Sequence, residues 1–223
     1  MKTLRISIFI LWLCLLPAGL QASEDLLTLE DGTAVKILFF EPKIHGEKTR
    51  LALLISGETS NTFMARAQFW LGKELVDRGW AIAVPIAPDR TGFGGDNAHL
   101  LPELVSMLRA QHDLGSQKPL LVGISSGGSI ALTIAAHYPA DFSGVVAAPG
   151  RLHDVSEIQP LMGMPIYLRI GEKDDFRWNR QLDTIVERLQ TAGGIVDAAI
   201  VPEARHIFQL DWDNLEAWLK HLQ

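Results

Sequence analysis

Cysteine is nearly absent from this sequence. Its one cysteine, Cys14, lies in an N-terminal apolar segment, so no disulfide can form within the chain and the core alone must stabilise the fold. The sequence shows no cluster of cysteine and histidine residues with the spacing of a metal site. Internal repeats and low-complexity tracts are absent as well. We therefore expect neither a metal nor an organic cofactor.

The chain also has little positive charge. Acidic residues outnumber lysine and arginine by 26 to 20, which gives a formal net charge of -6, and basic residues form no local run. A surface that binds nucleic acid is normally rich in lysine and arginine. Hydrophobic residues make up 48% and charged residues 21% of the chain, which is typical of a globular protein. We expect a globular domain that does not bind nucleic acid.

A long hydrophobic run occurs only at the N-terminus. Lys2 and Arg5 precede the run ISIFILWLCLLPAGL, and the small residue Ala22 follows it closely. This order is typical of a secretory signal peptide, and the run is shorter than the roughly 20 residues of a membrane-spanning helix. We predict a signal peptide over 1–22 and a periplasmic or secreted protein without stable membrane insertion; an uncleaved anchor is the alternative. Cleavage would change the net charge to -8.

Short apolar runs alternate with amphipathic segments in the rest of the chain. Strands buried on both faces of a sheet read as short continuous apolar runs, whereas helices place apolar residues three or four positions apart. Asp-Gly between the first two runs is a strong hairpin signal. We predict strands over 26–30, 34–41, 50–56, 80–87, 119–125, 142–150, 164–172 and 194–203, and helices over 63–79, 98–113, 127–139, 178–194 and 210–222.

Regular alternation of strands and helices is typical of an α/β fold. The connections are short, and the one over 151–164 leaves no room for a lid domain. We predict a single domain over 23–223. It should contain a mostly parallel central sheet with an N-terminal antiparallel hairpin, helices on both faces and no cap domain.

Two adjacent serines lie among glycines at the end of a predicted strand. The motif GISSG over 123–127 fits Gly-x-Ser-x-Gly, a strained strand-to-helix turn that raises one hydroxyl above the sheet. Counting back two positions from Ser125 gives Gly123, whereas counting back from Ser126 gives an isoleucine. Ser125 is therefore the candidate nucleophile, and Ser126 would offer its backbone N–H at a helix N-terminus. A glycine-rich turn without chemistry is the alternative.

A serine hydroxyl needs a base, and the base needs an orienting carboxylate. The carboxyl ends of parallel strands share one edge of the sheet, and His206 follows the last predicted strand. The other six histidines lie in predicted helices or in other connections, so His206 is the candidate base; a surface histidine is the alternative. Asp174 and Asp175 follow the preceding strand. Spacing from the strand end favours Asp174, with Asp175 in reserve.

These motifs resemble the α/β-hydrolases, especially lidless esterases similar to the dienelactone hydrolases and the phospholipase/carboxylesterase group. The resemblance covers nearly the whole chain after the N-terminal segment. It rests on GISSG over 123–127, GEKD over 171–174 and EARH over 203–206, which follow the family order of serine, acid and histidine. The stretch APDRTGFGGD over 87–96 also resembles the loop after the fourth strand of that fold.

The resemblance implies a serine hydrolase that cleaves small-molecule carboxylic esters through an acyl-enzyme. Ser125 would attack, His206 would transfer the proton, and Asp174 would orient the imidazole. An oxyanion hole would combine the backbone N–H groups of Ser126 and Glu58. The family often has His-Gly where this sequence has Ser-Gly-Glu over 56–58, which places an acidic side chain beside the developing oxyanion.

The substrate is specified only weakly by the sequence. Phe176, Trp178 and Phe208 could line an apolar substrate pocket or pack in the core. A peptidase or a thioesterase on the same fold is one alternative to an esterase. A non-catalytic binding protein that keeps the scaffold is the other. No feature of the sequence indicates an oligomeric state.

Overall fold

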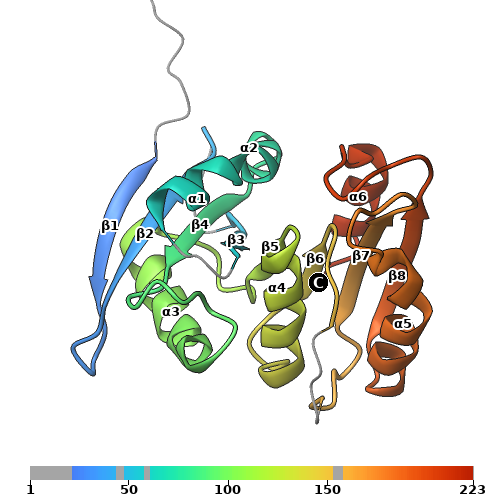
Figure 1. The fold of residues 1–223 in the computed structure, drawn as a ribbon. Helices are drawn as coiled ribbons and strands as arrows, with labels where there is room; N and C mark the ends of the chain where they lie inside the picture. Colours follow the sequence, from blue (N-terminus) through green and yellow to red (C-terminus); the bar gives the residue numbers. More distant parts are fainter. Residues whose placement is uncertain (1–21, 44–47, 58–60, 153–157, 223) are drawn as a thin grey trace, which may run out of the picture.

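A single twisted sheet organises the molecule (Figure 1). The computed structural model describes residues 22–43, 48–57, 61–152 and 158–222, so the predicted signal peptide lies outside the described residues except for Ala22. Within them, eight strands run in the order β1-β2-β4-β3-β5-β6-β7-β8. The strands are β1 (Ser23–Thr28), β2 (Ala34–Phe40), β3 (Leu51–Ile55), β4 (Ala81–Ile86), β5 (Leu120–Gly123), β6 (Gly144–Ala147), β7 (Pro165–Gly171) and β8 (Ile195–Val201).

The pairing confirms a mostly parallel sheet with an N-terminal antiparallel hairpin. Strand β2 is antiparallel to both of its neighbours, β1 and β4, and the other neighbouring pairs are parallel. In the described part of the chain, no helix is long and apolar enough to cross a bilayer, and we see no cap domain over the sheet (Figure 1).

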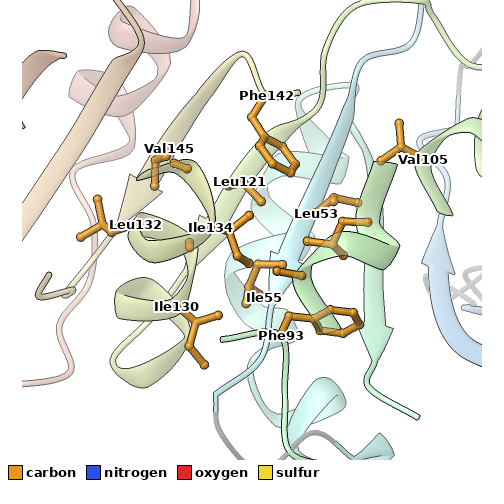
Figure 2. Packing of buried hydrophobic residues seen from close by; sticks show 14 of the residues in the cluster. Leu53, Ile55, Phe93, Val105, Leu121, Ile130, Leu132, Ile134, Phe142 and Val145 are labelled. Atoms are coloured by element: carbon orange, nitrogen blue, oxygen red, sulfur yellow. The ribbon is translucent and has the colours of Figure 1, made fainter. Parts of the chain in front are cut away.

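Helices cover both faces of the sheet, as Figure 1 shows. Helices α3 (Leu101–His112), α4 (Ser126–His137) and α5 (Leu182–Thr191) pack on one face, and α1 (Thr62–Ala67), α2 (Phe69–Asp77) and α6 (Trp212–Leu219) pack on the other. Two short 3₁₀ helices, η1 (Asp96–Leu100) and η2 (Trp178–Gln181), precede α3 and α5. In Figure 2, Ile130 and Ile134 of α4 lie among Ile55, Leu121 and Phe93. Each such buried side chain contributes about 1.5–3 kcal/mol of hydrophobic free energy.

The helix predicted over 63–79 is divided in two. Gln68, with φ -90° and ψ -3°, ends α1 and begins α2. Next to the break, the ring of Phe69 stacks on Phe40 of β2, with centroids 3.5 Å apart. The prediction of one continuous helix was therefore wrong, because apolar periodicity continues through the break and Gln68 is neither proline nor glycine. The expected glycine at the helix end is present: Gly79 has φ +85°.

The strand order places a change of winding direction between β3 and β5. After β3 the chain crosses to β4 on one side, whereas β5 pairs with β3 on its other side. In an open parallel sheet, ligands bind at the carboxyl ends of strands where the winding direction changes in this way. Gly57 lies just after β3 and Ser125 lies just after β5, so the serine motif is located at this point.

His112, the last residue of α3, connects the helix to the N-terminal hairpin. Its Nε2 lies 3.0 Å from a carboxylate oxygen of Asp25 on β1, and its Nδ1 lies 3.0 Å from one of Glu41 after β2. The ring also stacks on Phe39, with centroids 3.8 Å apart. Because β1 is an edge strand with one neighbour, a side chain that binds it from another element restrains the hairpin.

Replacing His112 by alanine should lower the free energy of unfolding by about 2–3 kcal/mol, because two hydrogen bonds to charged groups and a ring contact are lost. Chemical denaturation measures this change. His137→Ala is the matched control, since this exposed ring binds the carbonyl of Thr133 in its own helix and lies 6.5 Å from the ring of the adjacent Tyr138, and it should change stability by less than about 0.5 kcal/mol. Equal effects of the two variants would contradict the role assigned to His112.

Candidate active site

The turn between β5 and α4 holds Ser125 in a strained conformation. Ser125 has φ 57° and ψ -124°, a backbone geometry that costs on the order of 1–3 kcal/mol for a residue with a side chain. Its N–H donates to the carbonyl of Pro149 at 2.8 Å, and its own carbonyl accepts from the N–H of Ser129 at 3.0 Å. These two bonds fix the turn from both sides.

Gly123 and Gly127, on either side of Ser125, lie too close to neighbouring backbone to carry a side chain. A Cβ added at Gly123 would lie 2.3 Å from the carbonyl oxygen of Gly127, and one added at Gly127 would lie 2.2 Å from that of Ile55. Neither backbone oxygen can move without displacing a strand or a helix. The glycines therefore allow α4 to start directly against the ends of β5 and β3.

Three side chains from separate loops form a hydrogen-bonded chain. The Oγ of Ser125 lies 2.7 Å from Nε2 of His206, and Nδ1 of His206 lies 2.7 Å from Oδ2 of Asp174. The other carboxylate oxygen of Asp174 accepts the N–H groups of Phe176 at 2.9 Å and Trp178 at 3.1 Å. His206 and Asp174 are both buried, so the imidazole is held in one orientation with its second nitrogen directed at the hydroxyl.

The two adjacent aspartates have different partners. Asp174 contacts His206, whereas Asp175 forms an ion pair with Arg205, whose Nε lies 3.1 Å from its Oδ1. The hydrogen bonds from Arg205 hold the pKa of Asp175 below its ordinary value. The loop after β7 and the loop after β8 are therefore joined by two adjacent pairs, Asp174 with His206 and Asp175 with Arg205. The loops are further joined by the N–H of Lys173, which donates to the carbonyl of Ala204 at 2.7 Å.

The loop with His206 also packs directly on the end of β7. A Cβ at Gly171, the last residue of β7, would lie 2.1 Å from the carbonyl oxygen of Arg205. A side chain at this position would move the imidazole away from Ser125.

The three aromatic residues predicted for a substrate pocket are not together. The rings of Phe176 and Trp178 meet the His206 ring edge-on, with centroids 4.6 and 4.9 Å away. Phe176 is 64% exposed, whereas Trp178 also packs against the core. Phe208 packs on the opposite face of the sheet, where it lines a hollow of about 280 Å³ whose lining includes none of Ser125, Asp174 and His206.

Of the two backbone N–H donors predicted for an oxyanion hole, the one of Ser126 lies among the described residues. Ser126 begins α4, and the first N–H groups of a helix have no partner within it and lie at its positive end. The loop after β3 approaches this point closely, since a Cβ at Gly57 would lie 2.1 Å from the Oγ of Ser126. Glu58 lies outside the described residues.

Two residues near the turn, Ser129 and Arg151, were not predicted from the sequence. Ser129 is fully buried; its hydroxyl donates to the carbonyl of Ser125 at 3.3 Å and accepts the N–H of Arg151 at 3.0 Å. The available signals were a serine one helical turn after Ser125 and an arginine directly after the strand predicted over 142–150. Among the described residues, we find no group of three histidine, cysteine or acidic side chains that could hold a metal ion.

The fold is similar to those of solved carboxylesterases and of one part of a peptidase. The Bacillus cereus carboxylesterase superposes with a TM-score of 0.65 at 16% identity, covering 83% of this chain and 94% of the other. The phospholipase/carboxylesterase of Dyadobacter fermentans gives a TM-score of 0.62 at 17% identity, covering 82% and 95%. Porphyromonas gingivalis dipeptidyl peptidase 4 gives 0.71 at 14% identity, covering 91% of this chain but 35% of the peptidase.

Sequence comparison gives a more specific result. No curated protein sequence matches the chain. A family model described as "Alpha/beta hydrolase family" matches residues 52–222, a range that includes the serine turn and both loops that meet it. The chain therefore belongs to the alpha/beta hydrolase family.

Proposed function

We propose that this protein is a serine hydrolase that cleaves carboxylic esters. The observation that carries the proposal is the pair of 2.7 Å contacts that join the Ser125 hydroxyl, the His206 imidazole and the Asp174 carboxylate. A hydroxyl in contact with a base that a buried carboxylate orients has the geometry of an activated nucleophile. The hydroxyl lies at the carboxyl ends of the strands, which is the edge of an open parallel sheet where ligands bind.

In the proposed mechanism, Ser125 Oγ attacks the ester carbonyl while Nε2 of His206 takes the hydroxyl proton. The charge on the carbonyl oxygen develops near the N-terminus of α4, where the N–H of Ser126 is a donor. His206 then protonates the departing alcohol, which leaves an acyl-enzyme on Ser125. A water molecule, activated by His206 in the same way, then attacks the acyl-enzyme and releases the acid from Ser125. Asp174 stabilises the imidazolium that forms in both the acylation and the deacylation step.

Features of the turn favour an enzyme over a binding protein that keeps the scaffold. The positive φ of Ser125 is strained, and strain of this kind persists where the surrounding structure enforces it and clusters at functional sites. A binding protein would have no use for a strained serine within hydrogen-bond distance of a buried histidine. The carboxylesterase and phospholipase/carboxylesterase likenesses favour an ester as substrate.

A peptidase is the less favoured assignment. The chain covers 35% of Porphyromonas gingivalis dipeptidyl peptidase 4, so it resembles only one part of that protein.

The residues predicted as a signal peptide, 1–22, lead us to propose that the hydrolase acts in the periplasm or outside the cell.

Replacement of Ser125 by alanine should abolish labelling by a fluorophosphonate probe and lower kcat for 4-nitrophenyl esters by at least about 10⁴-fold, because the nucleophile is lost. Ser126→Ala is the matched control. It keeps the backbone N–H, and we expect labelling to remain. Labelling of the Ser125→Ala protein at an unchanged rate would overturn the proposal.

The adjacent aspartates provide a second test. Asp174→Asn should lower kcat by about 10³- to 10⁴-fold, because an amide no longer stabilises the imidazolium or fixes its tautomer. Asp175→Asn removes the charge of an exposed ion pair, which contributes little, and keeps an oxygen that can accept the backbone N–H of His206, so kcat should change by less than about threefold. Steady-state kinetics on one ester measures both variants. Full activity of Asp174→Asn would show that the orienting carboxylate is assigned to the wrong residue.

A further inference from the structure

Arg151 is bound by its backbone to the serine turn. Its N–H donates to the hydroxyl of Ser129 at 3.0 Å, and the same hydroxyl donates to the carbonyl of Ser125 at 3.3 Å. Arg151 follows β6 on the carboxyl side, so it lies at the same edge of the sheet as the proposed nucleophile. Its position relative to Ser125 is therefore fixed by one buried side chain.

The guanidinium of Arg151 lies over the indole ring of Trp178. Its Cζ is 5.3 Å from the ring centroid, and the same indole meets the ring of His206 edge-on at 4.9 Å. One aromatic side chain thus separates a permanent positive charge from the imidazole.

The charge of Arg151 has no carboxylate partner among the described residues. Its Nε is buried and, within the same residues, has no hydrogen-bond acceptor. Arg205 and Arg169 do have such a partner, since Arg205 pairs with Asp175 and Arg169 pairs with Asp197. Arg109 also has a buried Nε without an acceptor, so the place of Arg151 beside the serine turn is what distinguishes it. An aromatic face attracts a cation but offers no lone pair in the plane of the guanidinium. A buried donor without an acceptor is unfavourable, and an anionic ligand would supply the acceptor.

We infer that Arg151 forms an anion-binding subsite beside the proposed nucleophile, and that the substrates are esters carrying a carboxylate. This inference rests on the proposed function. A planar guanidinium with several donors fits a carboxylate better than it fits a neutral group, and such charge-assisted hydrogen bonds are about twice as strong as neutral ones. The Trp178 ring restricts the guanidinium, so less freedom is lost when the anion binds.

The test compares two esters with acyl chains of equal length. The 4-nitrophenyl monoester of glutarate carries a terminal carboxylate, and 4-nitrophenyl pentanoate has a methyl group in its place. Arg151→Met should lower kcat/KM for the glutarate ester by about 10- to 100-fold, the factor expected for the loss of a charge-assisted hydrogen bond. It should lower kcat/KM for the pentanoate ester by less than about threefold.

The control variant is Arg180→Met. Arg180 is an exposed residue of η2, so its replacement removes the same charge from a neighbouring segment without removing the subsite. Its ratio of kcat/KM for the two esters should match the wild type. A loss of equal size for both esters in Arg151→Met, or no loss for the glutarate ester, would overturn the inference. The same comparison of 4-acetoxybenzoate with 4-acetoxybenzamide shows whether a carboxylate on the alcohol side is also recognised.

A second measurement does not depend on the folding of Arg151→Met or on catalysis. Free glutarate should raise the melting temperature of the wild type in proportion to its binding, whereas glutaramide should not. An equal effect of the two compounds, or none from glutarate, would contradict an anion site. If the wild type cleaved neither ester, the proposed function would fail, and the melting experiment would still decide whether the protein has an anion site.

Discussion

The strained turn at Ser125 is the constraint on which the other features depend. A serine with φ 57° is stable only where its surroundings hold it, and here they are backbone carbonyls packed against bare glycines. The same packing brings the end of β3, the end of β5 and the start of α4 to one point. The hydroxyl and the positive end of the helix therefore coincide at the carboxyl edge of the sheet because of one local geometry.

Pairing of the two loops after β7 and β8 supplies the other half of the site. The contact between Asp174 and His206 is flanked by the ion pair of Asp175 with Arg205 and by close packing of the second loop on Gly171. Hydrogen bonds from the backbone to Asp174 leave its carboxylate a single orientation. The imidazole is thus positioned by adjacent loops rather than by contact with the serine alone, as pre-organisation of a site requires.

Much of the fold and of the candidate site could be predicted because the signals are local. Buried parallel strands are short apolar runs, and each predicted strand is present within a few residues. The glycine spacing around Ser125 specifies the turn, and the order of strands places His206 and Asp174 at the same edge. The division of the helix over 63–79 could not be predicted in this way, because it occurs at Gln68, where the sequence has neither proline nor glycine.

The sequence by itself determined the fold class, the position of the serine turn and the choice of Ser125 and His206, since periodicity and chain order are written along the chain. Only the tertiary structure decided which aspartate faces His206, which aromatics surround the ring, and that Phe208 lies on the other face. It also decided that the guanidinium of Arg151 lies beside Trp178 without a carboxylate partner among the described residues. These are contacts between residues far apart in the chain, and their distances depend on how the loops pack.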